Sequence, residues 1–445
     1  MTLLPSPAPG VPVDPTTASN LPTDPPKDPG AQKQPGRYGM LPRLAGNSYI
    51  PLGLFARVPL AMLTIGVLTL VTSMSDSYAI GGFAAGAVGV GAAVGAPLLG
   101  YLADQLGQKR VLLVAAVVNA LAVAGIVVLV YSLSSFDGGA TLAVLATTFF
   151  AGATSPQVGP LSRVRWMALI KKAPASQQGP LVDTAMSMEG TADEVTFVMG
   201  PALVGLLASF VAPWLPLVLA ASMTAVLVSL FAIHPTHHAA AARGVSSTTA
   251  NAGYVAKETV NWFKVALPVM GMLLMGTFFG SSQTALTAFT GVYGSVDQGG
   301  LMYAIMGSSS AIAALSVAYW PAKFKHAWRW VLTSTLMSLG AGAFLLPDSL
   351  GSMAIVLLLV GIPVGPTMVT IFSVGSMVAP PQWMGTVMTA LASGIVAGTA
   401  LGASISGQLA QTQGYHAAFL VPVSAASALA LLGLVSAVVL RRRRA

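Results

Sequence analysis

Four ionisable residues inside otherwise apolar segments offer the most obvious chemistry in this sequence. Glu189, Asp193 and Glu194 lie within one long apolar run, and Arg57 lies within another. Glu189 and Asp193 are four residues apart and share one face of a helix, whereas Glu194 is turned away by about 100°. Carboxyl groups held in such surroundings bind and release protons when water reaches them, so the chemistry they offer is proton transfer.

The charge balance of these four residues favours proton binding. A charged side chain at the centre of a bilayer costs at least about 2.5 kcal/mol, so each retained charge needs a reason. One arginine cannot neutralise three carboxylates, and burial favours the protonated form of an unpaired acid. Arg57 is expected to pair with at least one acid, and the surplus negative charge predicts a preference for cationic or neutral polar compounds. The alternative is a structural salt bridge that locks two helices together.

Composition places these residues in a membrane protein. Of the 445 residues, 55% are hydrophobic and only 8% are charged, and the mean hydropathy is +0.77. An ordinary soluble domain is about one quarter charged, so a chain this apolar cannot cover its surface for water. The chain has no cysteine, which excludes disulfides and thiolate metal sites. The formal charge of +8 does not indicate nucleic acid, because its distribution fits a membrane topology.

The apolar runs predict an all-α integral membrane protein with about twelve spanning helices. The predicted helices cover residues 49–73, 78–103, 111–133, 141–161, 182–210, 214–233, 265–292, 301–319, 331–346, 350–378, 386–410 and 417–440. They form two six-helix bundles at 47–233 and 264–440, joined by a cytoplasmic connector at 234–263. Residues 1–46, rich in Pro, Asp, Thr and Gly, are expected to be a disordered cytoplasmic tail, and residues 441–445 a basic cytoplasmic tail.

The basic residues support this count of helices. Every Lys and Arg except Arg57 falls in a tail or in a connection that lies on the same side as the tails. The connections on the other side carry only acids, namely Asp76, Asp137, Asp297 and Asp348. Because cytoplasmic loops carry an excess of Lys and Arg, both termini are expected in the cytoplasm.

Glycine and proline recur at corresponding places in the two halves. The repeated positions are Pro156 and Pro160 against Pro363 and Pro366, and Gly200 and Gly205 against Gly402 and Gly407. Interruptions at equivalent helices point to a binding site near the membrane midplane, at the interface between the repeats. The alternative is that these small residues simply allow close helix packing.

The connection after the second helix carries a loop motif, with matching residues Gly100, Leu102, Ala103, Asp104, Gly107, Lys109, Arg110 and Leu113. This motif resembles the signature of the major facilitator superfamily. The resemblance spans about residues 49–440 and implies a transporter of the bacterial inner membrane. Within the superfamily, the sequence looks similar to actinobacterial members. It also makes the first and fifth helices neighbours, within pairing reach of each other.

The loop motif has a physical reading of its own. Asp104, at a helix end, can be held by Arg110 and by the amide dipole of a neighbouring helix, forming a latch at the cytoplasmic mouth. Gly107 allows the chain to reverse tightly. The equivalent stretch of the second half, Tyr319 to Lys325, has lost the motif, so a latch there would be weaker.

Other candidate residues follow from the resemblance. Gly200, Pro201 and Gly205 look like a degenerate form of the family's antiporter signature. The seventh helix normally lines the cavity, so the resemblance makes Ser282, Gln283 and Thr287 candidates for substrate contact, together with the midplane prolines Pro160 and Pro366. Hydrogen bonding between helices is the alternative for the hydroxyl groups.

The function expected from the sequence is alternating-access transport rather than enzyme activity. The leading hypothesis is proton-coupled export of a small organic molecule or drug by a monomer in the lipid bilayer. The runner-up is proton-coupled uptake of a nutrient such as a sugar or organic acid, and a receptor without transport is a remote alternative. No cofactor or nucleic acid is expected. No metal site is expected either, because His234, His237 and His238 lie in a connector without nearby acids.

Overall fold

The computed structural model describes residues 36–240, 261–294 and 298–441, and within these ranges every regular element is helical. Contacts divide the chain into Met1–Gly36 and Arg37–Ala445. Nearly all of the first unit lies outside the described residues, as do most of the predicted connector, Asp297 and most of the basic tail. All elements below belong to the second unit.

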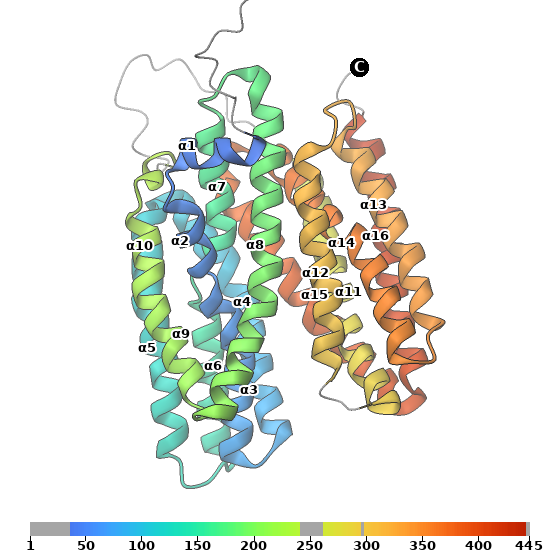
Figure 1. The fold of residues 1–445 in the computed structure, drawn as a ribbon. Coiled ribbons are helices and arrows are strands. Elements are labelled where there is room, and N and C mark those ends of the chain that lie inside the picture. Colours follow the sequence, from blue (N-terminus) through green and yellow to red (C-terminus); the bar gives the residue numbers. More distant parts are fainter. Residues whose placement is uncertain (1–35, 241–260, 295–297, 442–445) are drawn as a thin grey trace, which may run out of the picture. The chain divides into compact units, whose positions relative to one another are not determined.

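Helices α2 to α10 form the first half of this unit. They are α2 (Tyr49–Phe55), α3 (Val58–Ser75), α4 (Tyr78–Leu106), α5 (Gln108–Ser132), α6 (Gly138–Ala153), α7 (Val158–Ile170), α8 (Ala175–Phe210), α9 (Leu215–Met223) and α10 (Ser229–Ile233), with a π-helical segment, η2 (Thr224–Val228), between the last two. Figure 1 shows them as one bundle, in blue to green.

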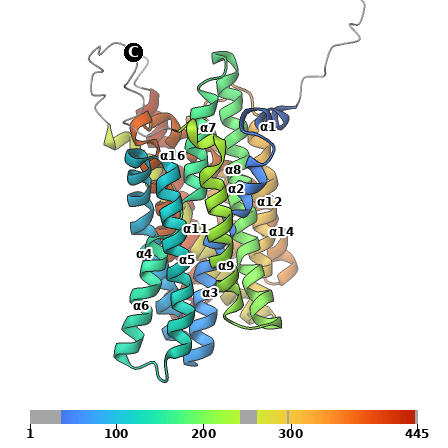
Figure 2. The same cartoon turned by 90° about the vertical axis from the view of Figure 1, so that its left-hand side faces the viewer.

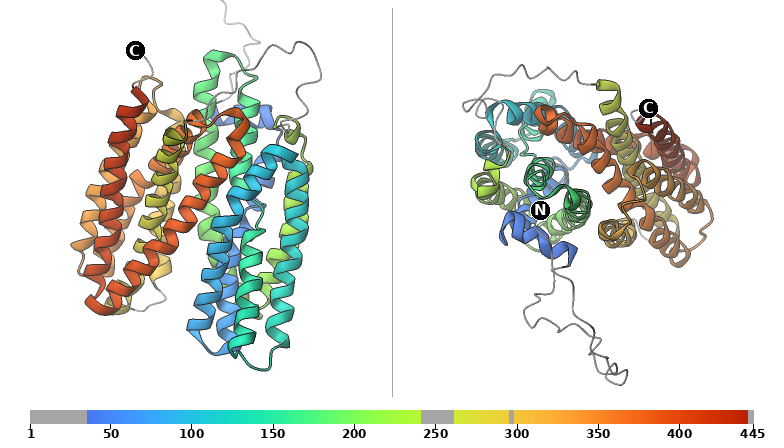
Figure 3. Two further views of the ribbon diagram at one scale, coloured as in Figure 1. Left: turned by 180° about the vertical axis from the view of Figure 1, so that it is seen from behind. Right: turned by 90° about the horizontal axis from the view of Figure 1, so that it is seen from above.

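Helices α11 to α16 form the second half. They are α11 (Trp262–Tyr293), α12 (Gln298–Ser316), α13 (His326–Gly342), α14 (Leu350–Val378), α15 (Met384–Gln413) and α16 (Tyr415–Arg441). Figure 3 shows this second bundle, in yellow to red, from behind and from above. Within the described residues, eleven helical stretches are long and apolar enough to cross a membrane. The predicted ninth helix is α13, whose 17 residues continue into the short η5 (Ala343–Leu345).

The two ends of the unit differ in charge. One end, here named the latch end, holds the α4–α5 turn and the α7–α8 connection (Figure 2). The starts of α13 and α15 lie at the same end, in contact with Asp183 and Asp104. The opposite end, the far end, holds the α3–α4, α5–α6 and α15–α16 connections. Exposed Lys109, Arg110, Lys171 and Lys172 lie at the latch end. Asp76 and Asp137 lie in far-end connections.

The halves share a hydrophobic core towards the latch end. The largest apolar cluster combines α7 residues such as Leu161 and Trp166 with α14 and α15 residues such as Phe372 and Leu391. A second cluster, which includes Val71 and Val130, contains only residues of the first half and extends towards the far end. Burial of apolar surface therefore joins the halves mainly at the latch end.

Two spans of the first half are interrupted, which corrects the predicted continuous helices. The first span breaks at Ala56 and Arg57, just before Pro59, which has no N–H to donate within the first turn. The fourth breaks over residues 154–157, where Gln157 has a non-helical ψ of 64°. Beyond that break α7 continues to Ile170, so the fourth span extends past the predicted end at residue 161. The tenth span, α14, stays continuous through Pro363 and Pro366.

The end of the predicted tail is also corrected, because residues 37–45 are helical. They form η1 (Arg37–Met40) and α1 (Leu41–Ala45), with Leu41 fully buried. The Tyr38 hydroxyl donates to the Leu315 carbonyl at 2.6 Å, and Arg37 donates to the Ala318 carbonyl near the end of α12. Buried apolar surface and these bonds offset the entropy of ordering the segment. Residues 1–35 of the predicted tail lie outside the described residues.

Candidate functional site

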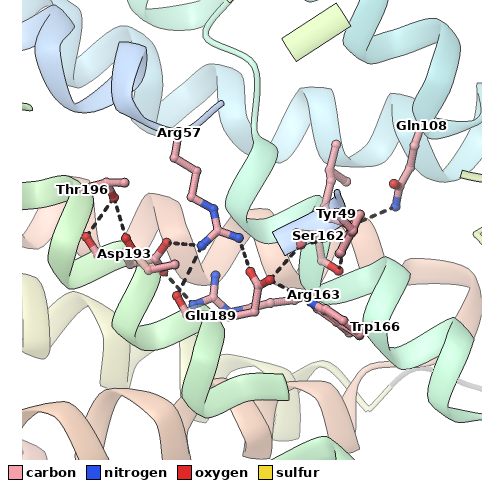
Figure 4. A network of polar contacts seen from close by, with 11 residues as sticks. Tyr49, Arg57, Gln108, Ser162, Arg163, Trp166, Glu189, Asp193 and Thr196 are labelled. Carbon is pink, nitrogen blue, oxygen red and sulfur yellow. Dashed lines mark hydrogen bonds and ion pairs between the residues drawn. The ribbon is translucent and has the colours of Figure 1, made fainter. Parts of the chain in front are cut away.

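Arg57 lies at the break between α2 and α3 and extends its side chain to α8. Its guanidinium group pairs with the Glu189 carboxylate, and its Nη1 also donates to Asp193 Oδ1 at 3.1 Å and to the Glu189 carbonyl at 3.3 Å. Figure 4 shows the arginine between the two acids. The expected pairing of Arg57 with at least one acid is confirmed, and it joins the first and fifth spans.

Glu189 is the most completely paired acid of the site. Its Oε1 accepts from Ser162 Oγ and from Trp166 Nε1, both at 2.8 Å, while its other oxygen meets Arg57. The residue is only 2% exposed. The Tyr49 hydroxyl lies 2.8 Å from Ser162 Oγ and extends the network to α2. One cation and two further donors therefore satisfy both oxygens of the Glu189 carboxylate.

Arg163 adds a second cation that the sequence analysis had assigned to a cytoplasmic connection. It lies within α7, only 1% exposed, and its Nη2 donates to Asp193 Oδ2 at 2.6 Å. Its guanidinium group also lies 3.7 Å from the centre of the Phe372 ring of α14. The expected balance of three acids against one base is therefore wrong, because a second arginine joins Arg57 and the two pair with Glu189 and Asp193. The apolar residues around Arg163, including Trp166, were the signal that the fourth helix continues.

Glu194 lies on a different face of α8 and meets the other half of the protein. Its Oε1 accepts from Ser310 Oγ of α12 at 2.8 Å. Among the described residues, no Lys, Arg or His nitrogen comes within 4.0 Å of its carboxylate. With 7% exposure, Glu194 is a buried acid without a cation. The predicted group of Glu189, Asp193 and Glu194 thus separates into two ion-paired acids and one unpaired acid.

Asp104 makes the predicted contact with the dipole of a neighbouring helix. Its carboxylate accepts from the backbone N–H groups of Gly385 at 2.9 Å and Thr386 at 2.7 Å, and from Thr386 Oγ1 at 2.7 Å. These donors belong to the first turn of α15, so Asp104 interacts with the positive end of that helix dipole. The latch therefore joins the end of α4 in one half to the start of α15 in the other.

The glycines of the loop motif allow this close approach. A Cβ on Gly100 would lie 2.0 Å from Thr389 Oγ1 and 2.7 Å from the Gly385 carbonyl oxygen, so only glycine fits there. Gly107 joins α4 to α5 with a φ of 88°, in the region that favours glycine. Lys109 and Arg110 follow it, exposed in the first turn of α5.

A further pair between the halves was missed by the sequence analysis. Asp183 of α8 accepts from Arg329 Nη1 of α13 at 2.8 Å, and its other oxygen lies 2.8 Å from His326 Nε2. Arg329 is only 1% exposed. It had been assigned to a connection, and Asp183, an acid in the same apolar run as Glu189, was the available signal. Asp183 and Asp104 both join the halves at the latch end.

The predicted cavity residues differ in burial. Ser282, Pro160 and Pro366 are buried. Gln283 is exposed, and Thr287 is half-buried and donates to the Gln283 carbonyl at 2.9 Å. Pro160 lies on α7 one turn before Arg163, which brings it closest in sequence to the charged network. The assignment of these residues to a cavity stays a prediction.

The residues of the antiporter-like stretch differ in their surroundings. A Cβ on Gly200 would lie 2.6 Å from Ala61 Cβ, so this glycine lets α8 pack closely against α3. A Cβ on Gly205 would have no heavy atom within 4 Å. Pro201, between them, is half-buried. The contact at Gly200 is an example of close packing through small residues.

The polar groups outside the spans have simple partners. His234 lies 3.2 Å from Ser48 Oγ and 3.1 Å from Thr236 Oγ1, and burial lowers the pKa of His234, which favours its neutral form. Within the described residues, no group of three His, Asp or Glu could hold a metal ion. Burial also raises the pKa of Tyr38 to about 12, so its hydroxyl remains a donor to Leu315 at physiological pH.

Comparison with known families identifies the class of protein. The family model of the Major Facilitator Superfamily matches residues 50–395, and the chain belongs to this superfamily. It is accordingly a multi-pass membrane protein and a transporter rather than an enzyme. No curated protein matches the sequence.

Solved structures share the fold at low identity. The human organic anion transporter MFSD10 (TETRAN) is similar at 19% identity and a TM-score of 0.65, covering 90% of this chain and 100% of its own. A bacterial homologue of the iron transporter ferroportin, in an outward-facing state, has 12% identity, a TM-score of 0.65 and coverages of 87% and 98%. The transporter FucP in its outward conformation has 13% identity, a TM-score of 0.61 and coverages of 88% and 99%.

Proposed function

We propose that this protein is a proton-coupled secondary transporter of a small organic molecule, and that Glu194 is its coupling carboxyl group. The observation that carries the proposal is the position of Glu194, which is buried between the halves, is bonded to Ser310 and has no cation within 4.0 Å in the part of the chain that the structure describes. An uncompensated acid in a low-dielectric site favours the protonated form, whereas water exposure favours the charged form. Glu189 and Asp193 are less suited to this role because arginines already compensate their charges.

Alternating access would link the protonation of Glu194 to the movement of the halves. The Ser310 hydroxyl belongs to α12, so separation of α8 from α12 removes a partner of the acid and admits water. Thr191 Oγ1 also donates to the Ala311 carbonyl at 3.1 Å, one turn from Glu194 on α8. Separation at this junction therefore breaks two polar contacts between the halves and changes the surroundings of the coupling acid.

We assign the latch end to the cytoplasm of a bacterial inner membrane, which makes the described conformation outward-facing. The exposed basic residues of the latch end and the acids in far-end connections support this orientation through the positive-inside rule. Both termini then lie in the cytoplasm. The Asp104 and Asp183 contacts close this cytoplasmic end, and two of the solved relatives are outward-facing.

Export and uptake remain two directions of the same proposed coupling. The antiporter-like Gly200, Pro201 and Gly205 leave the direction open, and the packing of Gly200 against Ala61 gives this glycine a structural role that has no direction. One observation supports uptake: the second arginine, Arg163, allows the site to bind anionic nutrients. FucP, a solved relative in fold, is described as a fucose:proton symporter.

Proteoliposomes that contain a pH-sensitive dye test the proposal. The purified protein would be challenged with organic cations, organic acids, sugars and nucleosides under an imposed pH gradient. At least one compound should move protons only in vesicles that contain the protein. Entry of protons as the compound leaves means export, and entry of both together means uptake. Compound flux that leaves the pH unchanged and ignores the gradient would contradict proton coupling.

A further inference from the structure

Arg57 and Arg163 converge on Asp193 and still have unused hydrogen-bonding capacity. The two guanidinium groups reach this carboxylate from the α2–α3 break and from α7, at 3.1 and 2.6 Å. The Nε atom of each arginine is buried and has no partner within the described part of the chain. A buried donor without an acceptor costs free energy. The two unpaired Nε–H groups therefore indicate that an acceptor binds there in the working transporter.

Asp193 is the member of this cluster that is easiest to replace. Its side chain is 16% exposed, whereas those of Arg57 and Glu189 are 6% and 3% exposed. Glu189 is held by Ser162 and Trp166 in addition to Arg57, whereas within the described ranges the side chain of Asp193 has the two arginines as its only partners. A competing anion would therefore displace Asp193 before it displaces Glu189.

Gly159 marks the place where such an anion would meet all three groups. A Cβ at this glycine would lie 3.3 Å from Asp193 Oδ1, 3.4 Å from Arg57 Nε and 3.6 Å from Arg163 Nη1. One point, the position of the missing Cβ, thus lies 3.4 Å from the unused Nε of Arg57 and 3.6 Å from Nη1 of Arg163. Planar guanidinium groups are suited to bidentate recognition of a carboxylate.

We propose that Arg57 and Arg163 bind the carboxylate of an organic acid substrate, and that Asp193 is an internal competitor for the same arginines. This inference rests on the proposed transport function, and it names the substrate class. It also revises the expected preference for cations, because that preference depended on Arg57 being alone. Phe372 of the second half stacks on Arg163, so a ligand at this arginine is bound where the two halves meet.

Competition at this site gives a balanced exchange of charge. A proton from the medium, relayed through the neighbouring coupling acid Glu194, binds to an Asp193 oxygen, both arginines are released, and the substrate carboxylate takes the vacated position. One O–H bond forms, no other covalent bond changes, and the net charge of the site is the same before and after. The charged groups that face Asp193 are Arg57 and Arg163, with Glu189 and Glu194 on its own helix. One proton and one carboxylate then move in the same direction, which corresponds to uptake.

Thermal-shift measurements on the purified full chain test this site with matched probes. The probes are benzoate, succinate and phenylacetate, each compared with its uncharged amide. Asp193→Asn removes the competitor, so at least one carboxylate should bind it about tenfold or more tightly than the parent at pH 7.5. Binding to the parent should strengthen as the pH falls, and this dependence should be much weaker in Asp193→Asn.

Three other variants separate a binding site from a structural ion pair. Arg163→Lys keeps the charge but loses the planar fork, and it should weaken carboxylate binding about tenfold. Arg165→Lys is the matched control, because Arg165 lies on the same helix, equally buried, but bonds to Gln108 and the Phe231 carbonyl. Gly159→Ala places a methyl group 3.3 Å from Asp193 Oδ1, slightly closer than ordinary contact, and 3.4 and 3.6 Å from the two arginines. A shift of a few tenths of an ångström accommodates it, so the variant should fold and lose carboxylate binding.

The outcomes are decisive in both directions. Selective stabilisation by carboxylates, enhanced in Asp193→Asn and lost in Arg163→Lys and Gly159→Ala but not in Arg165→Lys, supports the site. The proposal is overturned if no carboxylate stabilises the parent or Asp193→Asn more than its amide does, or if Gly159→Ala binds like the parent. Failure of proton coupling would appear separately, as carboxylate binding that persists without proton movement in proteoliposomes.

Discussion

Glu189 and Glu194 are five residues apart on α8, yet they occupy opposite kinds of environment. Glu189 lies within the first half, where Arg57, Ser162 and Trp166 satisfy its carboxylate. Glu194 lies between the halves and has Ser310 as its hydrogen-bond donor. The difference teaches that burial alone does not make an acid a proton carrier. Whether a buried acid can carry a proton depends on whether a cation lies beside it. It also depends on whether its surroundings change when the halves move.

The same contrast separates the two halves. The first half contains the buried acids, their arginines and the interrupted spans, whereas the corresponding α14 is continuous and contributes Phe372 as an aromatic surface for Arg163. Polar groups inside the membrane need partners, and a broken helix places side chains such as Arg57 where a regular helix would not. The second half provides Ser310, the first turn of α15, and Arg329 as counterparts.

The largest expected effect is on stability, from Glu189→Gln. The change leaves the buried Arg57 with a neutral group in place of Glu189 and with the one carboxylate, Asp193, that it shares with Arg163. Breaking a buried ion pair costs about 3–5 kcal/mol. Glu194→Gln removes no cation's partner and should cost no more than about 1 kcal/mol. Denaturant unfolding of both variants in the same detergent measures the difference. Equal losses would mean that the two environments do not differ as described.

The next effect concerns the pair between the halves at Asp183. In Asp183→Asn the buried Arg329 loses its carboxylate, so the closed latch end should be destabilised by about 2–3 kcal/mol. The cysteine-free chain allows single cysteines to be placed at latch-end and far-end positions for labelling. Labelling should shift towards the latch end. A matched Asp137→Asn variant at the far end should show no shift, and a shift in both variants would argue against a specific latch.

A smaller effect is expected from Asp104→Asn. The variant keeps one acceptor for the first turn of α15 but loses the charge that interacts with the helix dipole, at a cost of about 1 kcal/mol. The population with an open latch end should rise about fivefold, because the contact exists in one state only. The same cysteine labelling measures it. Unchanged accessibility of the cysteines from both sides would mean that Asp104 does not help to close the latch end.

The smallest effect is expected from Tyr38→Phe. The variant loses one hydrogen bond, from the Tyr38 hydroxyl to the Leu315 carbonyl, which is worth about 0.5–1.5 kcal/mol. It should open the latch end less than Asp104→Asn does. Double electron–electron resonance between spin labels on cysteines placed across the latch end measures the opening. An effect larger than that of Asp183→Asn would mean that η1, rather than the side-chain pairs, holds the halves together.

Much of the fold was predictable because hydropathy and charge fix the spans. The tenth helix was predicted at residues 350–378, and α14 covers Leu350–Val378. The loop motif also predicted that Asp104 meets a helix dipole, although the identity of α15 required tertiary structure. These features depend on the local pattern of apolar and charged residues, which can be read directly from the sequence.

The details of the site were less predictable because they depend on partners distant in sequence. Arg163 follows a proline-rich break, so the pattern alone did not show that α7 remains in the span. The pairing of Arg163 with Asp193, and of Asp183 with Arg329, depends on packing between helices. Order in residues 37–45 likewise results from contacts with the end of α12.

The most direct test of the account is proton movement by Glu194→Gln in proteoliposomes, with a substrate identified on the parent protein. Glu194→Asp, which keeps a carboxyl group, is the matched control. The account predicts that Glu194→Gln exchanges substrate across the membrane but neither moves protons nor accumulates substrate against its gradient, while Glu194→Asp retains part of both. Accumulation by Glu194→Gln at the parental level, with parental proton movement, would contradict the assignment of Glu194 as the coupling acid.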